Sequence, residues 1–142
     1  MKFSKEDEII FEKFFLLKEK RQFKKGLKLL DFLESKYKDN HVVHGLYGLS
    51  FFELKDYKQS ASHYSKVIAI HPHSELASLG LYVSLIHLGE ERKALEEFFR
   101  YTDIYKPQLY IDTIKELMES KSIVKFKSDK KKIEILCKKY CL

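Results

Sequence analysis

The chain has 142 residues, of which 44% are hydrophobic and 14% aromatic, with only 5 Gly and 2 Pro; this argues against disorder and against a turn-rich β protein. Such a length supports one compact domain or a short array of repeats. The formal net charge of +6 lies entirely in residues 121–142, because residues 1–120 carry 19 basic and 19 acidic side chains, so the basic balance describes a tail rather than a whole surface.

We expect a soluble, cytoplasmic protein without an export signal. Glu12 and Lys13 interrupt the apolar run near the N-terminus, and no stretch is long enough to cross a membrane. The two cysteines, Cys137 and Cys141, would share one helix face, a geometry poorly suited to a mutual disulfide and two ligands short of a zinc site. Both are therefore expected to be free thiols.

A first pair of helices is predicted before residue 40. Ser4 followed by Asp7 is a start signal of the capping-box kind, and apolar residues then recur at helical spacing until Lys20. A break at residues 21–22 separates this helix from a second one over about 23–35. The polar residues that follow are typical of a turn, and Asn40 is a good N-cap for the next helix.

Two further pairs follow the same plan. Helices are predicted over 41–54 and 57–70, then over 75–88 and from about 91 to 104. Pro72 ends the second pair and Pro107 the third, because the residue before a proline is pushed out of helical geometry.

The three breaks between paired helices begin 34 residues apart, at Arg21, Lys55 and Gly89. The same period relates four columns of similar residues: small Gly26, Ser60 and Ala94; large Leu30, Tyr64 and Phe98; then Leu33, Val67 and Tyr101; and the rings Tyr37, His71 and Tyr105. Conserved character in four columns across three copies indicates a helical repeat.

In period and pattern the chain resembles the tetratricopeptide repeat family. The central copy carries Tyr47, Gly48, Phe51, Ser60, Tyr64 and Pro72 in the family's framework positions. It departs from the family at His44, where Trp is usual, and at Val67, where Ala is frequent. The outer copies match more loosely, with Phe14 and Tyr82 in place of the glycine.

The resemblance implies an all-α, right-handed α-solenoid of three repeats, at about 7–40, 41–74 and 75–108, within a domain over residues 1–120. It also implies a capping helix, for which residues 108–119 are suited. The Lys-rich residues 121–142 are expected to form either an eighth, basic amphipathic helix or a frayed tail.

No catalytic motif is visible, and we expect neither an enzyme nor a cofactor. His41 and His44 are spaced i and i+3, and His71 and His73 flank Pro72, but no cysteine or carboxylate cluster joins them in the sequence. We therefore expect no metal site and interpret His44 as the aromatic of its repeat position, His71 as a turn residue and His73 as solvent-exposed.

The family resemblance places the first helix of each repeat along an inner groove. The basic and amide residues with which peptide-binding members hold a terminal carboxylate are absent from the corresponding positions, which are mostly apolar. The candidate partner-binding residues are Phe11, Phe15, Val42, Leu49, Phe52, Leu76, Leu79, Val83 and Ile86. The alternative is a register shifted by one residue, which would turn them into interior packing.

An apolar groove is unusual unless something fills it. A partner's helical or extended apolar segment, a second copy in a homodimer, or the chain's own segment from Ile123 onward could do so. We expect a non-catalytic binding module, an adaptor or chaperone, similar in size and organisation to bacterial type III secretion chaperones. A self-associating assembly protein is the first alternative.

Association of the tail with nucleic acid or a membrane is the second alternative. We do not favour it, because the remainder of the chain is neutral and aromatic residues in the tail are limited to Phe126 and Tyr140. A tail that is solvated or contacts a partner is the preferred interpretation.

Overall fold

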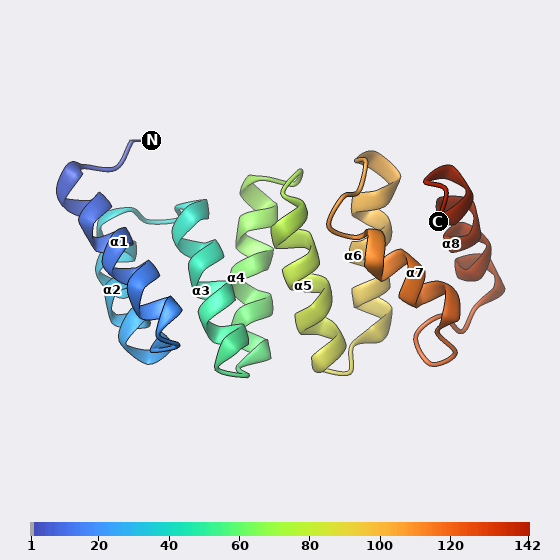
Figure 1. Ribbon diagram of the computed structural model, residues 1–142, viewed down its shortest axis with the longest axis horizontal. Helices are drawn as coiled ribbons and strands as arrows, with labels where there is room; N and C mark the ends of the chain where they lie inside the picture. Colours follow the sequence, from blue (N-terminus) through green and yellow to red (C-terminus); the bar gives the residue numbers. More distant parts are fainter. Residues whose placement is uncertain (1) are drawn as a thin grey trace.

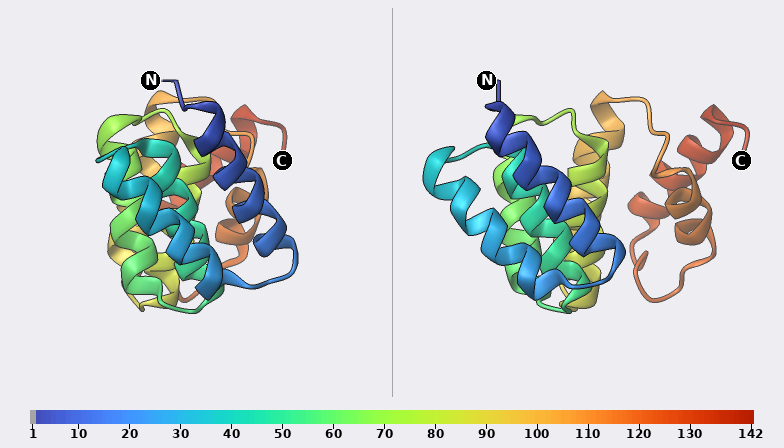
Figure 2. Two further views of the ribbon diagram at one scale, coloured as in Figure 1. Left: turned by 90° about the vertical axis from the view of Figure 1, so that its left-hand side faces the viewer. Right: turned by 60° about the vertical axis from the view of Figure 1, so that its left-hand side comes forward.

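The computed structural model describes residues 2–142, and in that part of the chain all regular structure is helical. The first six helices pack each against the next in chain order, and the last two pack against each other. The helices stand in a row with the termini at opposite ends (Figure 1; Figure 2, right). The eight helices are α1 (Lys5–Glu19), α2 (Phe23–Lys36), α3 (His41–Glu53), α4 (Tyr57–Ile70), α5 (Glu75–His87), α6 (Glu91–Ile104), α7 (Ile111–Glu119) and α8 (Lys127–Lys139). The fold is thus helical and repeat-like, as the sequence predicts.

Side-chain caps fix where the first helix of each pair begins. The Ser4 hydroxyl accepts from the Asp7 N–H, Asn40 accepts from the N–H groups of residues 42 and 43, and Ser74 accepts from the Ala77 N–H. Each cap satisfies backbone donors that have no partner inside the helix. The predicted cap at Asn40 is confirmed.

The turns inside the pairs repeat in backbone geometry as well as in sequence. Arg21, Lys55 and Gly89 all lie in the left-handed region, with φ values of 56°, 62° and 75°. In each turn the next residue donates its N–H to a carbonyl oxygen five positions earlier, at 2.8, 2.8 and 2.9 Å. This hydrogen bond is characteristic of the Schellman motif at a helix C-terminus. Its recurrence in all three turns confirms the predicted breaks.

The column of small residues lets neighbouring helices approach. Ser60 and Ala94 have no exposed surface. The ring of Tyr64 lies between two glycines: a Cβ added at Gly48 would come within 2.9 Å of the ring, and one added at Gly80 within 2.5 Å. Because both glycines face the same ring, α3, α4 and α5 share one packing centre.

The capping helix begins later than predicted. It starts at Ile111 rather than Gln108, because the carboxylate of Glu75 accepts the N–H groups of Gln108 and Tyr110 at 2.7 and 2.9 Å and holds that segment as a turn. Pro107 is buried beside it. The first residue of α5 therefore fixes the path of the chain into α7.

The Lys-rich segment forms the eighth helix, so the alternative of a frayed tail is wrong. Ile133 and Leu136 of α8 are buried in one core cluster with Phe98 of α6 and Tyr110. Asp129 is joined to Arg92 of α6 by an ion pair of 2.7 Å. The division between domain and tail at residue 120 stays a prediction.

Both cysteines are free thiols, as expected: Cys137 is buried in α8 and Cys141 is exposed just beyond it. Burial raises the pKa of the Cys137 thiol, with a further contribution from Glu134. Among the described residues, no helix combines the length and apolar character that crossing a bilayer requires.

Candidate binding groove

A hollow of about 450 Å³ lies along the first helices of the three pairs. We call it the groove. Its walls come mainly from α1, α3 and α5, and α4 contributes part of the floor. The lining residues are Phe15, Lys18, His41, Val42, Gly45, Leu46, Leu49, Tyr64, Val67, Ser74, Leu76 and Ala77.

Four of the nine candidate partner-binding residues line this groove: Phe15, Val42, Leu49 and Leu76. They come from three different helices. Phe15 and Val42 are exposed, and Leu76 keeps 68% of its surface in solvent. Nothing lies within 4 Å of the position that a Cβ on Gly45 would occupy, so the space above this residue is open.

The other five candidates pack elsewhere. Phe11 is buried, with its ring centroid 4.6 Å from that of Phe3, so interior packing is the correct interpretation for this residue. Phe52 is half-buried and lies edge-on to the rings of Tyr57 and His87. Leu79, Val83 and Ile86 are half-buried against the core cluster that continues into α7 and α8.

Some groove residues were missed by sequence reasoning. Tyr64 and Val67 were assigned to the framework, yet both also contribute to the groove floor. Their place in the repeat pattern concealed this second role, since a buried ring between two helices can present one edge to a hollow. His41 lies at one end of the groove, where its ring is 4.0 Å from that of His71.

Behind the groove, on the packed side of α3, His44 is an interior residue with only 1% of its surface exposed. Its Nδ1 lies 3.0 Å from Nδ1 of His63, which is stacked on Tyr47 at 4.5 Å between centroids. Burial, and then the neighbouring His44 and Lys66, lower the pKa of His63 to about 4. His63 is therefore neutral at physiological pH.

The other ring nitrogen of His44 faces two carboxylates that sequence reasoning did not connect with it. Nε2 lies 3.8 Å from Glu34 Oε1 and 3.7 Å from Asp39 Oδ1. It has no hydrogen-bond partner among the described residues. No carboxylate cluster lies beside the histidines in the sequence, as stated above, but folding brings two carboxylates next to His44.

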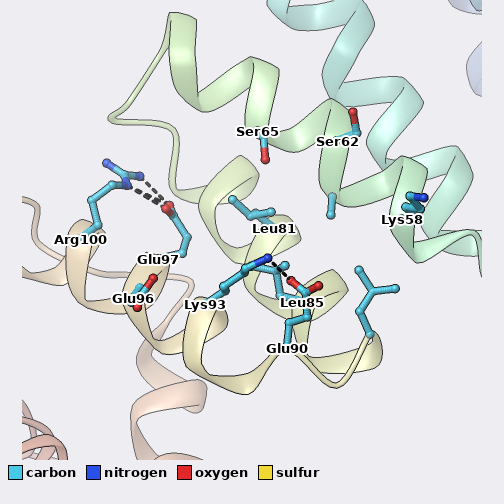
Figure 3. Close-up of a pocket in the computed structure, with 12 residues that line it drawn as sticks. Lys58, Ser62, Ser65, Leu81, Leu85, Glu90, Lys93, Glu96, Glu97 and Arg100 are labelled. Atoms are coloured by element: carbon cyan, nitrogen blue, oxygen red, sulfur yellow. Dashed lines mark hydrogen bonds and ion pairs between the residues drawn. The ribbon is translucent and has the colours of Figure 1, made fainter.

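A second hollow, of about 640 Å³, lies between α4 and α6 with Leu81 and Leu85 of α5 on its floor (Figure 3). Four of its six charged side chains pair with one another, as Figure 3 shows: Lys93 with Glu90 at 3.0 Å, and Arg100 with Glu97 at 2.7 Å. A charged ligand that binds to any of these four side chains would have to displace its partner. The groove is therefore the better candidate for a binding site.

Comparison with protein-family models, with curated proteins and with solved structures finds no match to this chain. Residues 2–142 form eight helices with repeat-like packing of neighbours. Assignment to a particular repeat family depends on the 34-residue period and on the residues that occupy it.

Proposed function

We propose that this chain is a non-catalytic protein-binding module, an adaptor or chaperone, of the tetratricopeptide type. In this proposal three repeats form a right-handed solenoid, and α7 and α8 close its C-terminal end. The recurrence of the left-handed residue at Arg21, Lys55 and Gly89 supports the repeat assignment. The groove holds an apolar or amphipathic segment of a partner protein.

The observation that carries this proposal is the gathering of exposed apolar side chains around one hollow. Phe15, Val42 and Leu76 come from three separate helices, yet all three are exposed at the same groove. Isolated exposed apolar residues are ordinary, whereas a contiguous patch marks a contact surface. Leu46 and Leu49 extend this patch along α3.

The chain's own C-terminal segment is a poor occupant of the groove. Ile123 packs against the C-terminal core cluster, and Val124, Ile133 and Leu136 are buried within it. No residue beyond Ala77 lines the groove. Filling the groove from the C-terminus would therefore expose a formed core, which favours a separate chain as the occupant.

The chemistry of the lining suggests what that chain presents. An amphipathic helix would place apolar residues at i, i+3 or i+4, and i+7 against the apolar wall. Lys18 is the only Lys or Arg among the lining residues, so we expect an acidic side chain on the partner at that end. A chaperone that protects an export substrate's aggregation-prone segment, as type III secretion chaperones do, is the specialised form of this proposal.

The proposal is tested with two matched substitutions. Leu76→Asp places a charge in the groove, and Ile104→Asp places the same charge on α6 outside it; the two side chains are 68% and 69% exposed. Both variants should keep the helical circular dichroism of the parent. In pull-downs from the native host, a partner should be lost with Leu76→Asp and retained with Ile104→Asp.

Retention of the same proteins by both variants would contradict the proposal. Sedimentation over a range of concentrations separates the self-association alternative, in which the parent dimerises and Leu76→Asp is monomeric. Salt-dependent binding to DNA or anionic vesicles that disappears when the α8 lysines are replaced would instead support the tail alternative.

A further inference from the structure

We propose that Glu34, Asp39 and His44 bind a divalent transition-metal ion, for which Zn²⁺ is the best match, where α2 passes into α3. The three residues each offer one ligand atom, and these atoms lie within 4.8 Å of one another. One imidazole nitrogen and two carboxylate oxygens are a common ligand set for Zn²⁺ and leave a fourth position for water. This inference does not depend on the groove having a partner.

The distances favour a metal ion over a direct hydrogen bond or a bridging water. Nε2 of His44 lies 3.8 Å from Glu34 Oε1 and 3.7 Å from Asp39 Oδ1, which is too far for an N–H···O hydrogen bond. Atoms bridged by one water would lie about 4.6 Å apart. Atoms that share a tetrahedral Zn²⁺ lie about 3.4 Å apart, the closest of the three to the observed separations.

The second observation is the buried nitrogen itself. His44 has 1% of its surface exposed, and its Nε2 has no hydrogen-bond partner among the described residues. Oε2 of Glu34 is likewise buried without a partner. Burying a polar atom without a partner is unfavourable, and a cation between these residues would give His44 Nε2 and the Glu34 carboxylate the partner that they lack among the described residues.

His63 completes the arrangement as a positioning residue. A metal-binding imidazole commonly donates its other N–H to a neighbouring group, and this bond fixes both tautomer and ring orientation. His44 Nδ1 lies 3.0 Å from His63 Nδ1. At this distance His63 Nδ1 can accept the Nδ1–H of His44, and this tautomer leaves the Nε2 lone pair of His44 directed at the two carboxylates.

The backbone allows the small closure that coordination requires. Asp39 lies in the left-handed region with φ of 55°, a conformation that Asp tolerates well, and its side chain is 86% exposed. This exposed side chain is free to move by the few tenths of an ångström by which its 3.7 Å separation from His44 Nε2 exceeds the separation of two atoms that share a Zn²⁺ ion. The two negative charges of Glu34 and Asp39 would neutralise the charge of the ion.

The test is a titration of the full chain with ZnCl₂ at pH 7.5, followed by calorimetry and by thermal unfolding. We expect saturable one-to-one binding that raises the melting temperature. Asp39→Asn and Glu34→Gln should each weaken affinity more than tenfold, because each removes an anionic ligand. Asp103→Asn, at an exposed aspartate on α6, is the matched control and should leave affinity unchanged.

A spectroscopic readout tests the role of His63. Replacing it with Phe preserves the stacked ring and should lower Zn²⁺ affinity by about 10–100-fold, with a change in the visible absorption band of bound Co²⁺. A variant that only loosened the packing would lower the melting temperature without altering that band. An unchanged affinity and an unchanged band would overturn the role assigned to His63.

Two results would overturn the site. One is absence of saturable Zn²⁺ binding by the parent chain at pH 7.5. The other is binding that survives Asp39→Asn but is lost with His73→Ala. That result would move the metal to the neighbouring rings of His41, His71 and His73, whose centroids are 4.0 and 5.2 Å apart in sequence order.

Discussion

The two faces of α3 show how one helix separates framework from candidate function. On the packed face Val43, Tyr47 and Gly48 are buried, and little space remains around them. On the groove face Val42 is exposed, and Gly45 has open space beside it. Apolar character alone therefore does not mark a contact surface: both faces are apolar, and only the one that borders the groove is available to a partner.

The largest expected effect is on the packed face, at the ring shared by three helices. Tyr64→Ala removes the ring that lies between Gly48 and Gly80 and should lower the free energy of unfolding by about 3–5 kcal/mol, as for other buried aromatic residues. Tyr64→Phe keeps the ring and is the control, with an expected cost below about 1.5 kcal/mol. Urea denaturation measures both, and equal costs would contradict a packing role for the ring.

Adding a methyl group at a glycine should have opposite effects on the two sides of the packing, at Gly80 against the Tyr64 ring and at Gly45 on the groove face. Gly80→Ala would place a Cβ 2.5 Å from the Tyr64 ring and should destabilise the fold by about 1–3 kcal/mol. Gly45→Ala meets nothing within 4 Å and should stabilise α3 by about 0.5–1 kcal/mol, because Ala has the higher helix propensity. Thermal unfolding of the two variants gives the sign of each change. A loss of stability with Gly45→Ala would show that the groove face is packed.

Sequence periodicity predicted much of this framework, because the residues that carry it recur every 34 positions. Gly48 and Tyr64 were both identified in this way. The position of Gly80 against the same ring was not, since it depends on how successive pairs stack. The start of α7 was placed three residues early because the contact that delays it joins Glu75 to Gln108 and Tyr110, far along the chain.

The sequence predicted only part of the candidate site, because periodicity does not specify which distant segments pack over a helix. Val42 and Leu49 of α3 lie in the groove as the family register implies, whereas Val83 and Ile86 of α5 are half-buried against a cluster that α7 and α8 help to form. The repeat register predicts which residues lie on the inner side of a helix, but it does not predict which other segments pack over that side. The grouping of Asp39 with His44 was missed because it arises at a non-periodic turn.

Smaller effects are expected at the turns that set the angle between paired helices. Lys55 adopts φ of 62°, so Lys55→Gly should stabilise the fold by about 1 kcal/mol, because glycine has no Cβ to clash in this region. Gly89→Ala, at the same position of the next repeat, should destabilise it by a similar amount. Opposite shifts in the urea midpoint would confirm that the two turns share one geometry.

Asp7 lies in the first turn of α1, the helix that supplies Phe15 to the groove. Hydrogen bonds from Lys36 first, then from Tyr37 and Ser4, lower the pKa of Asp7 from 3.8 to about 2. The ionised carboxylate therefore stabilises the folded state above about pH 4, and this contribution disappears as the pH falls toward 2. Acid unfolding should be less steep in Asp7→Asn, and an unchanged pH profile would contradict this role.

Site-specific photo-crosslinking in the native host tests whether the groove holds a segment of another protein. A photoreactive residue at position 76 reports from the groove, and one at position 104 reports from an equally exposed apolar position outside it. We predict a discrete crosslink to another protein from position 76 and none from position 104. Crosslinks of equal yield to the same proteins from both positions, or none from either, would contradict a groove that holds a partner's apolar segment.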